Sequence, residues 1–281
     1  MRVDEHSSMQ LQRHYDGVLR ELRVLTHPGL KDHDYILPIL AYGCTNNIHS
    51  GRPYLVVEYS DHGTLTDYLQ RIKPDLNERR EYALDVGYWF KALHDCKIVH
   101  GDVKPHNVLV FDTTDMYRTQ MAKLADFGGS LFELDEDQVA TYGGTSIYKA
   151  PEKDGRGKYK GPQLFTRSQL YPVDVYSFGL TVWEILNNGI QYIEEEWARP
   201  GELKLDTLRR IYDDEEDGIF RRGRTFCRRI FGGRQPTALQ IATLKTFRAT
   251  LRDNVAERSD MGNILEVLAH GTSLPHCSAA S

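Results

Sequence analysis

The chain has 281 residues, of which 40 are acidic and 35 basic, so its formal charge is −5. Hydrophobic residues make up 40% of the chain and charged residues 27%, which excludes a disordered chain and a generally basic nucleic-acid-binding protein. No apolar run approaches the roughly 18 to 20 residues that span a bilayer, and the N-terminus has no signal-peptide core. The four cysteines are widely spaced without a CxxC pair, so we expect a reducing, cytoplasmic location and no membrane or nucleic-acid partner.

The first elements follow from the spacing of apolar residues. A helix is predicted over residues 9–26, because its apolar positions recur at intervals of four and three. Apolar runs at 36–40 and 54–57, separated by a turn-rich segment, predict a two-stranded hairpin. Helices are predicted at 64–72 and 77–94, and the rest of the chain is mostly helical in pattern. The apolar positions of the first helix are Leu11, Tyr15, Val18, Leu22 and Leu25.

A run of opposite charges lies late in the chain. The acidic segment 213–217 is followed by six arginines between Arg221 and Arg234. Two interpretations stay open: the two runs neutralise each other or are solvated, or the arginines form a docking surface for an acidic peptide or a phosphate.

The segment IVHGDVKPHNVLVF, residues 98–111, carries the clearest chemistry. Asp102 could accept a hydroxyl proton, Asn107 could hold magnesium, and Lys104 could balance the charge of a transferring phosphoryl group. Asp126 ends a short strand further on, with Gly128 close behind, and suits a second metal ligand. These groups in this order predict a phosphoryl-transfer site.

With these motifs the sequence resembles the eukaryotic protein kinase family, from about residue 15 to residue 268. His100-Gly101-Asp102 with Asn107 resembles the catalytic loop, and Asp126-Phe127-Gly128 resembles the magnesium-binding DFG motif. The segment GTSIYKAPE, residues 144–152, is similar to the end of the activation segment, and DVYSFG, residues 174–179, resembles the start of the large lobe's central helix.

The resemblance implies a bilobal α+β fold. We expect a truncated small lobe over residues 1–60, with one helix, two strands and a hinge, and a complete, mainly helical large lobe over residues 61–275. Glu21 matches the glutamate of the family's helix C, and Arg258 matches the late arginine that pairs with the glutamate at Glu152. Asp174 would anchor the apolar spine that links the lobes.

The resemblance also implies ATP and magnesium as cofactors. Asn107 and Asp126 would hold the metal, and the nucleotide contacts would be Val57 at the gatekeeper position, Glu58 and Ser60 in the hinge, and Leu109. Lys104 and Thr145 match the serine/threonine branch of the family, and the resemblance implies that both belong to the catalytic residues, together with Asp102 and Asn107. Gly101 in place of the usual arginine resembles a group common among fungal kinase-like proteins.

The sequence departs from the family at its beginning. The family places a glycine-rich loop and a strand lysine before the helix C glutamate, but the only glycine before Glu21 is Gly17, and the first lysine of the chain is Lys31. Glu21 is therefore expected to lack its partner.

Three hypotheses follow from this departure. The chain is a protein kinase domain whose first strands are missing through truncation or an incomplete gene model, with impaired activity, or it is a pseudokinase that serves as a binding or scaffold module. A small-molecule phosphotransferase is the third, but GTSIYKAPE and DVYSFG are features that such enzymes lack. In each protein-kinase case we expect a protein substrate or partner, and an incompletely covered small lobe would favour oligomerisation.

Overall fold

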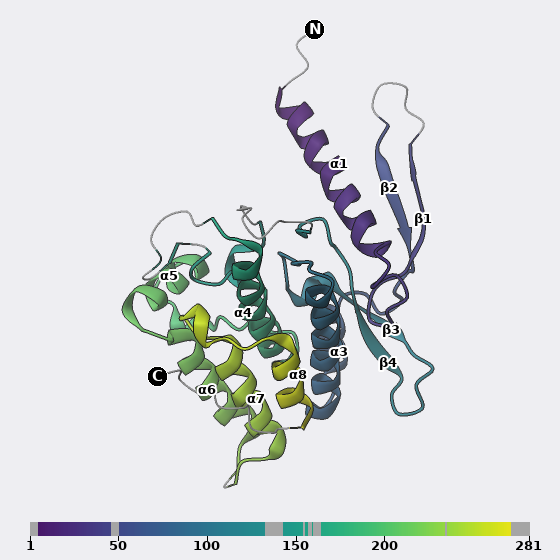
Figure 1. Ribbon diagram of the computed structural model, residues 1–281. Helices are drawn as coiled ribbons and strands as arrows, with labels where there is room; N and C mark the ends of the chain where they lie inside the picture. The colour runs from purple at the N-terminus through teal and green to yellow at the C-terminus, as the bar shows by residue number, and fades with distance from the viewer. Residues whose placement is uncertain are drawn as a thin grey trace, which may run out of the picture.

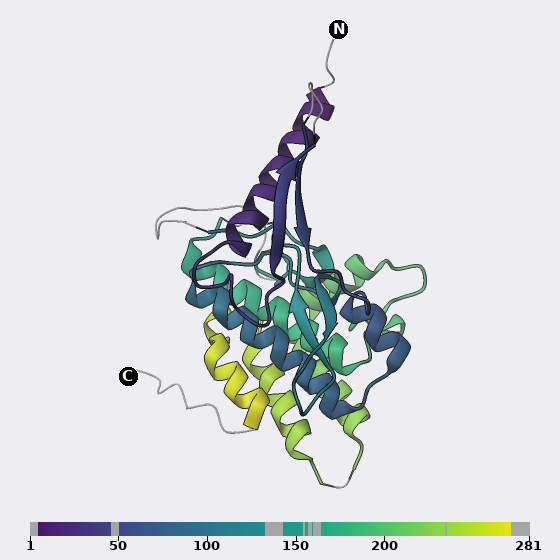
Figure 2. The same ribbon diagram turned by 90° about the vertical axis from the view of Figure 1, so that its right-hand side faces the viewer.

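The computed structural model describes residues 5–45, 51–132, 143–153, 155–156, 159, 164–233 and 235–270. The small lobe consists of α1 (Glu5–Leu25) and a hairpin of β1 (Ile39–Cys44) and β2 (Pro53–Val57). Both ribbon views show α1 and the hairpin side by side, standing as a narrow projection above a helical body (Figure 1, Figure 2). This arrangement confirms the predicted α+β fold with a reduced small lobe.

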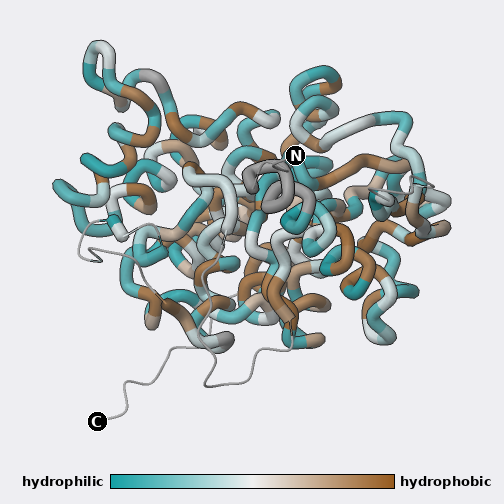
Figure 3. Tube along the Cα trace, turned by 90° about the horizontal axis from the view of Figure 1, so that it is seen from above, coloured by the Kyte–Doolittle hydropathy of each residue, from teal (hydrophilic) through white to brown (hydrophobic). Residues whose placement is uncertain are grey.

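The large lobe is built around α3 (Leu76–Asp95) and α4 (Arg167–Leu186), which contact one another. The hairpin of β3 (Val108–Asp112) and β4 (Gln120–Leu124) lies against α3. Four helices complete the body: α5 (Lys204–Asp214), α6 (Gly218–Phe231), α7 (Ala238–Thr250) and α8 (Met261–His270), and α2 (Leu65–Ile72) precedes α3. Seen from above, hydrophobic and hydrophilic stretches alternate along the tube, as amphipathic helices require (Figure 3).

Local signals explain where the helices α2 and α3 begin. The Thr64 side chain accepts a hydrogen bond from the Asp67 N–H at the start of α2. Asp75 and Glu78 form a reciprocal capping box at the start of α3. Both helices agree with the sequence prediction to within a residue or two.

The first predicted strand is displaced. The apolar run at 36–40 was expected to form it, but β1 begins at Ile39, and Ile36 and Leu37 are buried elsewhere. The Leu37 N–H donates to the Leu124 carbonyl at 3.3 Å, and the Leu124 N–H donates to the Tyr35 carbonyl at 3.2 Å. This short segment therefore pairs with β4 of the large lobe and joins the two lobes.

The central helix also differs from the prediction. The motif at 174–179 was expected to lie at its start, but α4 begins at Arg167, seven residues before Asp174. Thr166 and Gln169 form a capping box there, and Pro172 is accommodated inside the helix near its beginning.

The expected lobe boundary at residue 60 stays a prediction, and residues 271–275 of the predicted large lobe lie outside the described residues. No helix in the described ranges is long and apolar enough to cross a membrane.

The opposite charge runs pair with each other in part. Arg222 on α6 forms two hydrogen bonds of 2.9 Å with Glu215. Asp217 pairs instead with Arg252 at 2.8 Å, outside the basic stretch, and Arg229 pairs with Glu194 at 2.7 Å, outside the acidic segment. The Arg222–Glu215 contact supports the interpretation that the acidic segment neutralises part of the basic stretch. Arg234, the last of the six arginines, lies outside the described residues.

Candidate active site

The loop that carries Asp102 is fixed by the central helix. The fully buried carboxylate of Asp174 accepts the N–H of His100 at 2.7 Å and the N–H of Gly101 at 3.1 Å. The His100 Nδ1 atom accepts the Asp102 N–H at 3.0 Å. Complete burial lowers the pKa of His100 against the pull of Asp174, so the ring is neutral and serves as a support for the loop.

Asp102 lies at the centre of a hydrogen-bonded network. Its Oδ2 atom accepts the Lys104 ammonium at 2.6 Å, and its Oδ1 atom accepts both the N–H and the hydroxyl of Thr145 at 2.7 Å. The Lys104 Nζ atom also donates to the Thr145 hydroxyl at 2.8 Å. The structure thus brings together three of the residues that the motifs proposed as catalytic.

The network determines the charge of Asp102. Burial is the largest single influence and would raise its pKa, but the hydrogen bonds from Lys104 and Thr145 together outweigh it. The pKa of Asp102 is therefore held below its usual value, and the carboxylate is ionised at neutral pH.

Two glycines allow Thr145 to reach Asp102. Gly101 and Gly144 have φ angles of +90° and +93°, which favour glycine. A Cβ atom on Gly144 would lie only 2.5 Å from the Gly101 carbonyl oxygen. The sequence contained both glycines, but nothing in their spacing indicated this close approach.

Asn107 and Asp126 lie on two backbone segments that are tied together. The Ala125 N–H donates to the Asn107 carbonyl at 2.8 Å, so the residue before Asp126 is anchored to the catalytic loop. Asp126 has a φ of +65° and an exposed side chain. Phe127 packs behind it, with its ring centroid 5.7 Å from that of His100.

The donor set of these two residues suits magnesium. The Asn107 Nδ2 atom donates to the Asp102 carbonyl at 2.9 Å, which leaves its Oδ1 atom without a hydrogen bond to any described residue. Among the described residues, the Asp126 carboxylate accepts one hydrogen bond, from the Gly128 N–H at 3.3 Å. Two hard oxygen donors with open positions fit a cation that keeps water or phosphate ligands.

Glu21 on α1 faces the DFG segment. Burial is the main reason that the pKa of Glu21 is raised, and the nearby charge of Asp126 adds to this effect. The nearby backbone N–H groups of Phe127 and Asp126 lower the pKa of Glu21 and partly oppose the rise. The Glu21 carboxylate thus lies close to the backbone of the segment that carries Asp126.

The predicted nucleotide contacts lie around the connection between the lobes. Val57 packs partly buried against the core, and Leu109 is half-buried in β3. The Glu58 carboxylate pairs with Lys123 at 3.0 Å. The Ser60 hydroxyl donates to the Val110 carbonyl at 2.5 Å and accepts the Gly63 N–H at 3.0 Å, so this side chain holds the hinge against β3.

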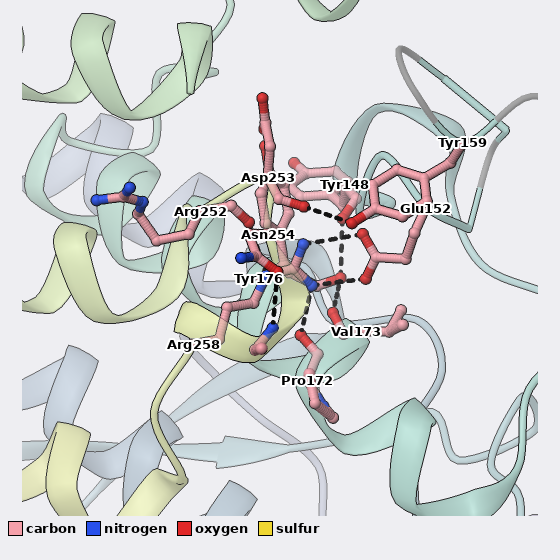
Figure 4. Close-up of polar contacts among 12 residues, drawn as sticks. Tyr148, Glu152, Tyr159, Pro172, Val173, Tyr176, Arg252, Asp253, Asn254 and Arg258 are labelled. Atoms are coloured by element: carbon pink, nitrogen blue, oxygen red, sulfur yellow. Dashed lines mark hydrogen bonds and ion pairs between the residues drawn. The ribbon is translucent and has the colours of Figure 1, made fainter. Parts of the chain in front are cut away.

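Glu152 and Arg258 form the buried ion pair between the activation segment and the late helices (Figure 4). The Arg258 Nη1 and Nη2 atoms lie 2.6 and 2.8 Å from the two carboxylate oxygens, and Nη1 also donates to the Pro172 carbonyl at 3.0 Å. The guanidinium stacks over the Tyr176 ring, 4.8 Å from its centroid. The side chains are 0% and 3% exposed.

A second buried carboxylate was not identified from the sequence. Glu184 on α4 is fully buried and accepts the Tyr148 hydroxyl at 2.8 Å and the Tyr192 N–H at 3.3 Å. It therefore supports the segment that carries Thr145. Burial raises the pKa of Glu184 to about 7, although the two hydrogen bonds and Lys204 oppose the change.

We expect stability to fall with pH because of Glu184. The pKa of Glu184 in the folded state, about 7, lies above the ordinary value of 4.5, so the folded state binds this proton more tightly than the unfolded state does. The free energy of unfolding therefore falls as pH rises from 4.5 to 7. Glu184→Gln removes this titration and should gain about 3 kcal/mol of unfolding free energy relative to the wild type between pH 4.5 and 8. Urea unfolding at both pH values measures the gain. The exposed Glu216→Gln control should show no such pH-dependent difference, and an equal gain there would contradict the assignment.

Comparison with known proteins identifies the family. The sequence matches the family described as protein kinase domain over residues 2–266. Calmodulin-binding receptor-like cytoplasmic kinase 1 of Arabidopsis thaliana is 35% identical over 175 residues, which are 59% of this chain and 34% of that protein. Serine/threonine-protein kinase chk-1 of Caenorhabditis briggsae is 28% identical over 188 residues, which are 64% of this chain and 34% of that protein.

A fungal relative completes the comparison. Protein kinase kin1 of Schizosaccharomyces pombe is 26% identical over 181 residues, which are 64% of this chain and 18% of that protein. The chain spans about a third or less of the length of these relatives. Because the family match takes in nearly the whole sequence, the chain belongs to the protein kinase family.

Proposed function

We propose that this chain carries the site of ATP-dependent phosphoryl transfer to serine or threonine hydroxyls of a protein substrate. The observation that supports this most directly is the Asp102 carboxylate, held ionised between Lys104 and Thr145. A general base must be unprotonated and must be positioned before the hydroxyl arrives. The network around Asp102 meets both requirements.

Each residue has a distinct part in the proposed reaction. Asp102 orients the substrate hydroxyl and accepts its proton, and Lys104 balances the negative charge on the transferring group. Asn107 and Asp126 would hold magnesium with their oxygen atoms. ATP, when bound with magnesium, supplies the γ-phosphoryl group. In the hinge, no backbone hydrogen bond ties Glu58 or Ser60 to another described residue, which leaves their backbone groups able to bind adenine.

The same proposal includes impaired activity in this chain. No lysine precedes Glu21 in the sequence, and the only glycine there is Gly17. Kinases use such a lysine, paired with the helix C glutamate, to align the phosphates. Phosphoryl transfer depends on this positioning. We therefore infer that the site has its catalytic groups but does not align the phosphates of the nucleotide fully.

A binding or scaffold role is the second candidate. Glu21 favours it, because its carboxylate faces the backbone amides of Phe127 and Asp126, which lower its pKa, and would have to turn from them to meet a lysine. In that case the loop that carries Asp102 and Asn107 serves as a surface for a partner protein rather than as a catalyst.

We test the proposed function by magnesium-dependent binding of ATP to the 281-residue chain. Calorimetry should show weak binding that magnesium strengthens, and Asp126→Asn should remove the magnesium effect because it loses a charged metal ligand. Asp61→Asn removes an exposed carboxylate near the hinge and serves as the matched control. The scaffold candidate would be favoured if the affinity for ATP were the same with and without magnesium. It would also be favoured if Asp61→Asn weakened ATP binding as much as Asp126→Asn.

Self-association through the small lobe and a cytoplasmic location are also part of the proposal. The hairpin exposes four large apolar side chains, which would gain from burial. The proposed location rests on the wide spacing of the four cysteines, which suits a reducing compartment. The apolar side chains are Leu40, Tyr42, Tyr54 and Val56, with 65%, 67%, 46% and 42% exposure.

A further inference from the structure

A groove lies at the junction of the two lobes. Its lining includes none of the residues of the catalytic network described above. It is lined by residues 31–36 and Pro38 on one side and by the β3–β4 hairpin, from Asp112 to Lys123, on the other. We call it the junction groove. Its volume of about 620 Å³ is in the range of sites that hold ligands or short peptide segments.

The cations in the junction groove are already paired. Arg118 lies 2.7 Å from the buried carboxylate of Asp85, and Lys123 lies 3.0 Å from Glu58. Lys31 lies 3.9 Å from Asp32. Each of these positive charges therefore has a carboxylate partner, and the first two are held with little freedom to bind an external anion.

Two acidic residues of the groove form no ion pair with a described cation. Asp112 pairs with His62 at 2.8 Å. Asp34 and Asp115 are exposed, and neither forms an ion pair with a described cation. From the part of the chain that the structure describes, the Asp115 carboxylate accepts one hydrogen bond, from the Tyr117 N–H at 2.8 Å. The groove thus presents uncompensated negative charge from both of its walls.

Apolar groups accompany these charges. Ile36 and Met121 line the groove, and Tyr35 stacks on Tyr88 with ring centroids 5.7 Å apart. The tip of the β3–β4 hairpin exposes Met116 and Tyr117, with 83% and 89% of their surfaces accessible. Large exposed apolar side chains next to a groove are typical of a protein-binding surface.

We propose that the junction groove binds a short basic segment of a partner protein, in which lysine or arginine alternates with aliphatic side chains. The positive groups would meet Asp34 and Asp115 on opposite walls, and the aliphatic groups would cover Met116, Tyr117 and the apolar floor. This inference goes beyond phosphoryl transfer and does not require that the chain be active.

The groove is connected to the catalytic site through β4. Its wall residue Tyr35 accepts the Leu124 N–H at 3.2 Å, and Leu124 lies two residues before Asp126. The Ala122 N–H donates to Asp85 at 2.8 Å, and Asp85 in turn holds Arg118. A segment bound in the groove would therefore contact the framework that carries the metal-binding Asp126.

The test uses the 281-residue chain and a labelled five-residue peptide of alternating leucine and arginine. Fluorescence anisotropy at physiological salt measures its Kd, and a peptide with glutamate in place of arginine is the charge control. Asp34→Asn with Asp115→Asn should weaken binding of the basic peptide about three- to tenfold, because two exposed charge pairs are lost. Asp213→Asn with Asp214→Asn makes the same change in net charge on α5 and should alter the Kd less than twofold.

Amide chemical shifts of the ¹⁵N-labelled chain locate the site, and the changes should fall in residues 31–38 and 112–123. Spermine, which carries the charge without the aliphatic groups, should bind more weakly than the peptide. The proposal is overturned if the basic peptide does not bind up to millimolar concentration, if the glutamate peptide or spermine binds equally well, or if both double variants weaken binding alike.

Discussion

Replacing Arg258 with alanine should lower the free energy of unfolding by about 3 to 5 kcal/mol, because it leaves the Glu152 carboxylate buried without its partner. Both side chains are almost fully buried, and the guanidinium also donates to the carbonyls of Pro172 and Arg252. The loss should occur whether or not the chain is catalytically active. Chemical denaturation of the wild type and the variant at neutral pH measures it.

Arg209→Ala is the matched control for this experiment. Arg209 pairs with Asp206 at 3.0 Å, but the two side chains are 61% and 50% exposed, so the change should cost less than about 1 kcal/mol. A loss for Arg258→Ala no larger than that of the control would show that the buried pair contributes little to stability.

The second large effect concerns activity. The 281-residue chain should phosphorylate proteins at a very low rate, and a fused glycine-rich hairpin and lysine strand ahead of Glu21 should raise this rate by on the order of 10²-fold or more. The reason is that Glu21 would gain the cation that its position implies, and the phosphates would be aligned over Asp126. Transfer of labelled phosphate to a protein substrate measures the rate.

Two variants of the extended chain control this prediction. Asp102→Asn should abolish the recovered activity, and Asp61→Asn, which replaces an exposed carboxylate outside the site, should leave it unchanged. Robust phosphorylation by the unextended chain that Asp102→Asn eliminates would mean that the missing lysine matters less than we propose.

Much of the architecture could be predicted because its signals are local. The pattern of apolar residues predicted α1, α2 and α3 to within a few residues. The register of β1 could not be obtained in this way, because Ile36 and Leu37 pair with Leu124, far away in the sequence. The start of α4 was missed because a capping box at Thr166 precedes the recognised motif.

In the candidate site, too, the sequence predicted some residues and could not predict others. The order of the motifs identified Asp102, Asn107 and Asp126, because their side chains would themselves accept the proton or bind the metal. The residues that position these side chains could not be predicted. Glu184 acts through its hydrogen bond with Tyr148, and Gly144 acts through its close packing on Gly101. Such roles depend on distances between segments, which composition and spacing do not contain.

The distribution of the core has a consequence for local unfolding. Of the twelve largest fully buried side chains, only Leu30 precedes residue 61, and the large aromatic rings all belong to the helical body. Segments with few buried apolar contacts open at a small fraction of the global unfolding free energy. The small lobe, which would cover the nucleotide, should therefore open locally more often than the helical body that carries the catalytic loop, so access to the site depends on this sub-global opening.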